Sequence, residues 1–275
     1  MSRALIAAIA IGAAVSGCAG GNDRRASHAG AATATPTPAP RAPLALAAVE
    51  APGAHLLDRV VVLGASVSAG LAARPIASSL SAGLAPDAAV LDASSVMFFQ
   101  DPFGNGRAAV DLAIGHRPTL VLALDFLFWF AYANASDDDR RARFDAGLAL
   151  LADLPGTLVV GDLPDMRGAN PRILGPAAVP SPDQLRALNE RLRRWARARP
   201  HTLVLPMAIW TEPLVTGAPI ELAPGERVAA RDLMFFDGLH ANSLGTWHLL
   251  MLVDAALERD LGVPVDALRL TRPAP

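Results

Sequence analysis

The chain has 275 residues, a formal net charge of −2 at pH 7 and a hydrophobic content of 52%. This length allows one large domain or two small ones, and the nearly neutral charge argues against a nucleic-acid partner. All 24 basic side chains are arginine, which excludes a lysine Schiff base, a P-loop lysine and a Ser–Lys dyad. The single cysteine, Cys18, excludes an internal disulfide and a zinc site built on several thiolates.

Residues 1–17 resemble the signal peptide of a bacterial lipoprotein. Arg3 provides the positive start, and residues 4–15 form an apolar stretch too short to span a bilayer as an ordinary helix. The run Val-Ser-Gly-Cys at 15–18 resembles a lipoprotein processing box, which implies cleavage before Cys18 and lipidation of that residue. The alternative is an ordinary signal peptide in which the cysteine occurs by chance.

Several acyl chains on Cys18 would anchor the protein stably in a membrane, whereas one chain would not. Ala19 follows the cysteine, which favours the outer membrane, so we expect a lipid-anchored protein of the cell envelope that faces the periplasm. Residues 18–55 are rich in Ala, Pro, Thr and Gly and cannot bury enough apolar surface to fold. We interpret them as a disordered tether and residues 56–275 as one domain.

Residues 56–275 alternate between strand-like and helix-like stretches. The predicted strands cover residues 60–63, 88–92, 119–125, 157–161 and 202–206. The predicted helices begin after Ser136, span residues 184–198 and span residues 244–261, the last with Asn242 or Ser243 as its N-cap. This alternation predicts a three-layer α/β/α fold around a doubly wound, parallel, five-stranded sheet.

Ser66 follows the first predicted strand, two positions after Gly64. Open α/β sheets place their active sites at the carboxyl ends of strands. The turn could present the serine Oγ outward and direct backbone N–H groups at a developing oxyanion. The alternative is a small-residue turn that only caps a helix.

Asp237 and His240 are three residues apart, so the carboxylate can meet the imidazole Nδ1–H. This contact would leave Nε2 free to accept the proton of a serine nucleophile. We expect the preceding apolar residues, 233–236, to form a dry wall behind the pair. The alternative is a chance Asp-x-x-His in a surface loop.

Together the two segments resemble the SGNH/GDSL hydrolase superfamily. Residues 64–70 read Gly-Ala-Ser-Val-Ser-Ala-Gly and are similar to the family's first block, Gly-Asp-Ser-x-(Ser/Thr)-x-Gly. The Asp-x-x-His at 237–240, followed by Asn242, Ser243 and Gly245, is similar to its last block. The resemblance implies a flavodoxin-like fold, with Ser66 as nucleophile, His240 as base and Asp237 as its partner. We predict no metal ion and no cofactor.

The chain also departs from the family pattern. Ala65 replaces the aspartate before the nucleophile, and residues 125–128 lack the asparagine of the third block. Ser94 and Ser95 stand where the second block has glycine. The Ser66 N–H therefore remains as an oxyanion donor, with Ser95 and Asp125 as candidates beside it. Each lost donor would raise the barrier by about 2.7–4 kcal/mol.

Asp125 allows two interpretations. A carboxyl held neutral by burial could donate to an oxyanion, or a carboxylate could accept backbone N–H groups of a loop. We favour the second interpretation. The aromatic run at 126–132 could likewise line an acyl pocket, but we expect it to belong to the core. The acidic residues 137–139 fit a first helical turn better than a metal site.

The sequence therefore predicts a serine esterase or lipase that cleaves a small-molecule, glycan or lipid ester through an acyl-enzyme on Ser66. One alternative is an O-acyltransferase that moves the acyl group to a glycan. Another is a degenerate hydrolase fold used for binding or for envelope structure, because the third block is missing.

Overall fold

The computed structural model describes residues 53 and 55–274, so the predicted signal peptide, Cys18 and nearly all of the tether lie outside the described residues. A parallel sheet with the order β2-β1-β3-β4-β5 forms the centre of the domain. Its strands are β1 (Arg59–Gly64), β2 (Ala89–Ser94), β3 (Leu120–Ala123), β4 (Thr157–Gly161) and β5 (Thr202–Leu205). All five predicted strands are confirmed, although β3 ends two residues before Asp125.

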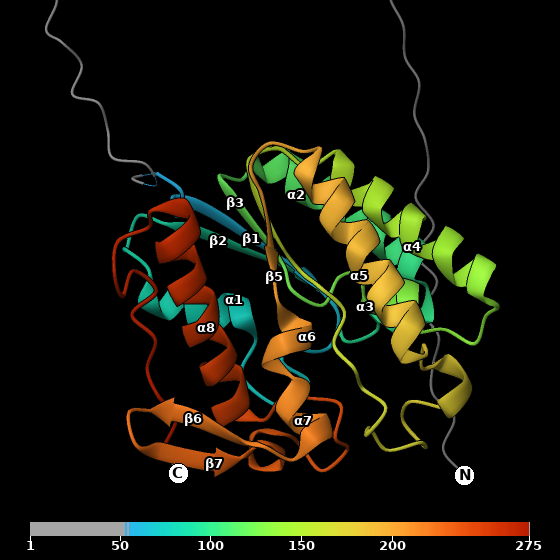
Figure 1. Ribbon diagram of the computed structural model, residues 1–275. Helices are drawn as coiled ribbons and strands as arrows, with labels where there is room; N and C mark the ends of the chain where they lie inside the picture. Colours follow the sequence, from blue (N-terminus) through green and yellow to red (C-terminus); the bar gives the residue numbers. More distant parts are fainter. Residues whose placement is uncertain (1–52, 54, 275) are drawn as a thin grey trace, which may run out of the picture. The chain divides into compact units, whose positions relative to one another are not determined.

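Helices cover both faces of the sheet (Figure 1). α1 (Ile76–Gly83) and α8 (Ser243–Leu261) pack on the face that carries Val60 and Val62. α2 (Pro102–His116), α4 (Asp137–Ala152) and α5 (Pro182–Arg197) pack on the face that carries Val61 and Leu63. Side chains that alternate along β1 thus fill two separate cores. The three-layer prediction is confirmed, and the strand order is the flavodoxin-like one.

Side-chain caps fix where the predicted helices begin. Ser136 accepts a hydrogen bond from the Asp139 N–H at the start of α4, where the acidic residues occupy the first turn. Asn242, rather than Ser243, caps α8 by accepting from the Gly245 N–H. Ser181 and Gln184 form a capping box at α5. α1 and α2 were not predicted.

The segment 206–233 contains elements for which the sequence showed no clear pattern. It forms α6 (Met207–Trp210), α7 (Glu212–Thr216) and the antiparallel pair β6 (Pro219–Ala223) and β7 (Glu226–Ala229), and ends in the 3₁₀ turn η3 (Ala230–Leu233). Figure 1 shows these elements beside the first turns of α8, at the carboxyl end of the sheet. They therefore lie at the edge of the sheet where parallel α/β folds have their active or ligand-binding sites.

The remaining short elements are α3 (Phe128–Ala131) and the 3₁₀ turns η1 (Phe98–Gln100) and η2 (Pro176–Ala178). Within the described part of the chain, no helix is long and apolar enough to cross a membrane. The same residues contain no group of three or more His, Cys, Asp or Glu side chains that could hold a metal ion.

Gly161, the last residue of β4, has no room for a side chain. A Cβ there would lie 2.2 Å from the Leu124 carbonyl oxygen and 2.9 Å from Met207 Cγ. We expect Gly161→Ala to destabilise the fold by about 1–3 kcal/mol, as overpacked core substitutions do. Thermal unfolding monitored by circular dichroism measures the change.

Gly115, in the last turn of α2, provides the matched control. A Cβ there meets nothing within 4 Å, so Gly115→Ala should stabilise the helix by up to about 1 kcal/mol. Equal melting temperatures for Gly161→Ala and the unaltered protein would contradict the packing described at β4.

Candidate active site

Ser66 lies in the turn that follows β1, beside the point where the strand order reverses. Strand β1 pairs with β2 on one side and with β3 on the other, and α1 and α2 leave toward opposite faces. Such a reversal leaves a crevice at the carboxyl ends of the strands. The chain thus places the Ser66 hydroxyl where an open α/β sheet can bind a ligand.

His240 and Asp237 meet Ser66 in one hydrogen-bonded series, although Ser66 and His240 are 174 residues apart. The distance from Ser66 Oγ to His240 Nε2 is 2.8 Å, and the distance from His240 Nδ1 to Asp237 Oδ2 is 2.6 Å. The carboxylate fixes the imidazole so that Nε2 faces the serine. The structure therefore brings together the three residues that the sequence analysis named.

Asp237 is held as an acceptor. Its Oδ1 accepts hydrogen bonds from the N–H groups of Leu239 at 2.9 Å and His240 at 3.0 Å. Burial alone would raise the pKa of Asp237, but these hydrogen bonds and the one from the His240 ring outweigh it and keep this pKa below its usual 3.8. The carboxylate is thus ionised near neutral pH, as an orienting partner for the imidazole requires.

The loop that carries the pair is closed by backbone hydrogen bonds. Phe235 N–H donates to the His240 carbonyl at 2.7 Å, and Asn242 N–H donates to the Leu233 carbonyl at 3.0 Å. Leu233 and Met234 face the pocket, but Phe236 is 84% exposed. The prediction that all of residues 233–236 form a dry wall is therefore only partly confirmed.

Asp125 accepts four hydrogen bonds from the turn that carries Ser66. Its Oδ1 accepts from Ala65 N–H at 3.0 Å and from Ser68 Oγ–H at 2.6 Å, and its Oδ2 accepts from the N–H groups of Val67 at 2.9 Å and Ser68 at 3.3 Å. Gly64 permits this approach, because a Cβ there would lie 2.1 Å from Oδ1. Burial raises the pKa of Asp125, while the four hydrogen bonds oppose that shift. The geometry favours the acceptor interpretation over a protonated oxyanion donor.

The candidate oxyanion donors differ in what they contact. Within the described residues, the Ser66 backbone N–H has no acceptor, so it is free to bind a ligand oxygen. The Ser95 backbone N–H donates to the Gly64 carbonyl at 3.0 Å, and its Oγ accepts from Met97 N–H at 3.1 Å. Ser95 is therefore engaged in holding the end of β2 against β1, and its N–H is not available to an oxyanion.

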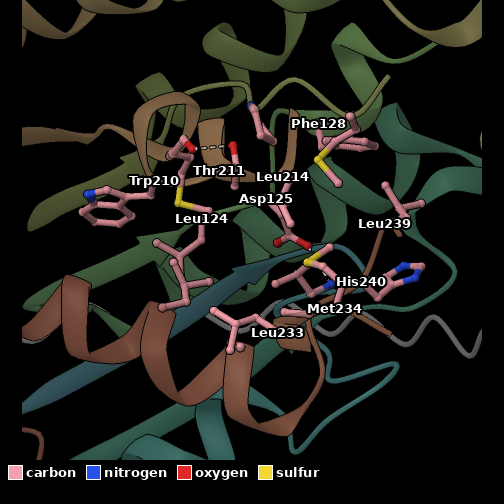
Figure 2. A pocket seen from close by; sticks show the side chains of 18 of the residues that line it. Leu124, Asp125, Phe128, Trp210, Thr211, Leu214, Leu233, Met234, Leu239 and His240 are labelled. Atoms are coloured by element: carbon pink, nitrogen blue, oxygen red, sulfur yellow. Dashed lines mark hydrogen bonds between the residues drawn. The ribbon is translucent and has the colours of Figure 1, made fainter. Parts of the chain in front are cut away.

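An apolar pocket of about 130 Å³ opens beside Ser66 (Figure 2). Phe128 and Trp129 line it, whereas Phe126 and Phe130 are fully buried, so the aromatic run serves both the pocket and the core. The segment 206–233 and α8 provide most of the remaining wall: Met207, Trp210, Thr211, Leu214, Ile220, Ala230, Leu233, Gly245, His248, Leu249 and Leu252. The sequence predicted α8 and named Leu233 and Gly245, but it did not indicate that the segment 206–230 lines a pocket, because α6 and α7 are too short to show a helical period.

Asp162 is a further buried residue that the sequence analysis missed. It follows β4, is 1% exposed and accepts from Ala208 N–H at 2.7 Å and from Arg193 Nη2 at 2.6 Å. Burial raises the pKa of Asp162, while the backbone and arginine contacts lower it. The carboxylate thereby joins β4 to α6, the helix that brings Met207 and Trp210 to the pocket.

No protein-family profile and no curated protein sequence matches the chain. Solved structures resemble it over about three quarters of its length. TesA is 16% identical, with a TM-score of 0.48 over 73% of this chain and 98% of that one. A GDSL-like lipase from Bacteroides thetaiotaomicron is 15% identical, with a TM-score of 0.46 over 78% and 94%.

The acetylxylan esterase Axe2 from Geobacillus stearothermophilus is also 15% identical, with a TM-score of 0.46 over 75% of this chain and 95% of that one. At these identities and scores the likeness concerns the fold and carries nothing about substrates. The chemistry must therefore come from the residues of this chain.

Replacing Asp125 should disturb the turn that carries Ser66. In Asp125→Asn the amide NH₂ would face backbone N–H groups that now donate to a carboxylate oxygen, and Asp125→Ala would leave those groups without an acceptor. Each unpaired group costs about 1–3 kcal/mol, so both variants should unfold at lower temperature. Paired thermal unfolding and pH–rate curves measure the effects. An Asn variant with full stability, full activity and less sensitivity to alkaline pH would instead support a protonated donor.

Proposed function

We propose that this protein is a serine ester hydrolase that works through an acyl-enzyme on Ser66. The observation that carries the proposal is the series Ser66 Oγ, His240 and Asp237, with distances of 2.8 Å and 2.6 Å, at the mouth of an apolar pocket. A free backbone N–H on the nucleophile itself supports the same chemistry, because it can bind the developing oxyanion.

In the proposed reaction, His240 Nε2 removes the proton from Ser66 Oγ as this oxygen attacks the ester carbonyl carbon. The Ser66 N–H donates to the oxyanion of the tetrahedral intermediate. The intermediate collapses, the bond to the alcohol oxygen breaks, and the imidazolium gives its proton to that oxygen. Water then attacks the acyl-serine with His240 again as base, which releases the acid and restores Ser66. Asp237 stabilises the imidazolium at both stages.

The pocket favours an ester with an apolar acyl or alkyl group, because most of the side chains that line it are apolar. Transfer to a glycan hydroxyl instead of water would use the same acyl-serine, so O-acyl transfer stays as a variant of this proposal. The second candidate is a binding protein with a hydrolase fold. The observation that favours it is that, among the candidate donors in the described residues, only the Ser66 N–H is free to bind an oxyanion.

Removal of the proposed catalytic groups should abolish turnover of a p-nitrophenyl ester while the fold is kept. Ser66→Ala and His240→Ala should each reduce kcat/KM by at least about 10³-fold, and Asp237→Asn by up to about 10⁴-fold because the imidazole loses its orienting acceptor. Steady-state kinetics and thermal unfolding on the same preparations measure the loss of activity and the stability of each variant.

The matched control is His201→Asn. His201 is exposed, lies just before β5 and has φ +59°, a conformation that asparagine tolerates. Its kcat/KM should equal that of the unaltered protein. Full activity in His240→Ala would rule out the assigned base.

Labelling with a fluorophosphonate probe distinguishes the hydrolase proposal from the binding-protein candidate. The hydrolase should form a covalent adduct on the peptide that contains Ser66, and Ser66→Ala should not react. An unaltered, folded protein that stays unlabelled at Ser66 would support the second candidate.

We also propose that a lipid on Cys18 anchors the mature protein in the envelope. The support is the sequence of residues 1–18, which lies outside the described residues. Cys18→Ser should move the protein from the membrane fraction to the soluble fraction, whereas Ser16→Ala, which keeps a small residue before the cysteine, should leave it membrane-bound. Fractionation followed by immunoblotting measures this, and membrane retention of Cys18→Ser would contradict the anchor.

A further inference from the structure

One face of α8 lines the pocket. Gly245, His248, Leu249 and Leu252 all contact it, and their spacing of three and four residues places them on one side of a helix. Met207, Trp210, Thr211, Leu214 and Ile220 of the segment 206–233 line the same pocket. A ligand that reaches from Ser66 to this face of α8 therefore contacts mainly apolar side chains.

His248 is the polar side chain on this face of α8, whereas Thr211 on the segment 206–233 already donates its Oγ1–H to the Met207 carbonyl at 2.7 Å. His248 is half-buried, and within the described part of the chain it has no hydrogen-bond or ion-pair partner. Burial lowers the pKa of His248 below its usual 6.5, so the ring is neutral near pH 7. A neutral imidazole offers one N–H donor and one nitrogen acceptor.

We propose that His248 determines specificity by binding an oxygen substituent, such as a hydroxyl, on the chain of the ester substrate. This inference rests on the hydrolase function proposed above and narrows its substrate class. A plain hydrocarbon chain would displace water from the imidazole without replacing its hydrogen bonds, which is unfavourable. A hydroxyl can donate to the bare nitrogen or accept from the N–H, so it satisfies either tautomer.

Binding to the Ser66→Ala protein tests the inference without relying on catalysis. The ligands are methyl octanoate and a series of methyl hydroxyoctanoates with the hydroxyl at successive carbons, and the measurement is isothermal titration calorimetry. At one position the hydroxylated ester should bind about two- to tenfold more tightly than the plain one, the usual range for one added hydrogen bond.

The variant His248→Leu, made in the Ser66→Ala background, should erase this preference and bind the plain ester at least as well. His248→Gln should keep part of it, because the amide both donates and accepts. The control Leu249→Ala removes carbon contacts from the same helix face, so it should weaken both ligands and leave their ratio unchanged.

The inference is overturned if no hydroxylated ester binds better than methyl octanoate, if neither kind binds, or if the preference survives in His248→Leu. A different set of results is expected if the proposed hydrolase function is wrong. In that case the unaltered protein would turn over none of these esters, although the His248-dependent preference would still be measured in Ser66→Ala.

Discussion

The four hydrogen bonds that Asp125 accepts connect the segments that follow two neighbouring strands, β1 and β3. They determine where the turn after β1 lies, and therefore where Ser66 Oγ lies relative to His240. An acceptor is needed here because the turn directs several N–H groups inward, and a buried donor without a partner is costly. Asp125 thus acts on Ser66 through the backbone and is best described as a positioning residue.

The other half of the site depends on Asn242. Its side chain caps α8 through Gly245 N–H, and its Nδ2 donates to the Asp232 carbonyl at 2.8 Å and to the Met234 carbonyl at 3.3 Å. One residue therefore fixes both the start of α8 and the loop that carries Asp237 and His240. The loop that carries Asp237 and His240 is therefore tied to the first turn of α8, the helix that also carries His248.

The sequence predicted the features that local pattern determines. Apolar runs predicted the five strands, of which β1, β3 and β4 are largely buried. The small-residue turn and the Asp-x-x-His predicted the three side chains that the fold brings together, Ser66, Asp237 and His240. Contacts between distant segments were harder to predict. Ser95 was a candidate donor because of its place after a strand, but nothing local shows that Gly64 takes its N–H.

The pocket wall was the least predictable part. The segment 206–233 consists of short elements, and tertiary contacts decide which of its apolar residues face the pocket. Its sequence therefore shows neither the two-residue period of a strand nor the 3.6-residue period of a helix. Phe236 shows the reverse error. Its apolar side chain suggested burial, but the structure leaves it exposed. Asp162 illustrates the same point, because its partners, Arg193 and Ala208, lie 31 and 46 residues away.

The central claim is that Ser66 carries the acyl group during turnover. The most direct test mixes the protein with excess p-nitrophenyl ester, quenches with acid within the first turnovers and measures the intact mass, followed by peptide mapping. We predict a mass increase equal to the acyl group on the peptide that contains Ser66, absent in Ser66→Ala. Ester turnover with the acyl group on another residue, or turnover that persists in Ser66→Ala, would contradict the account.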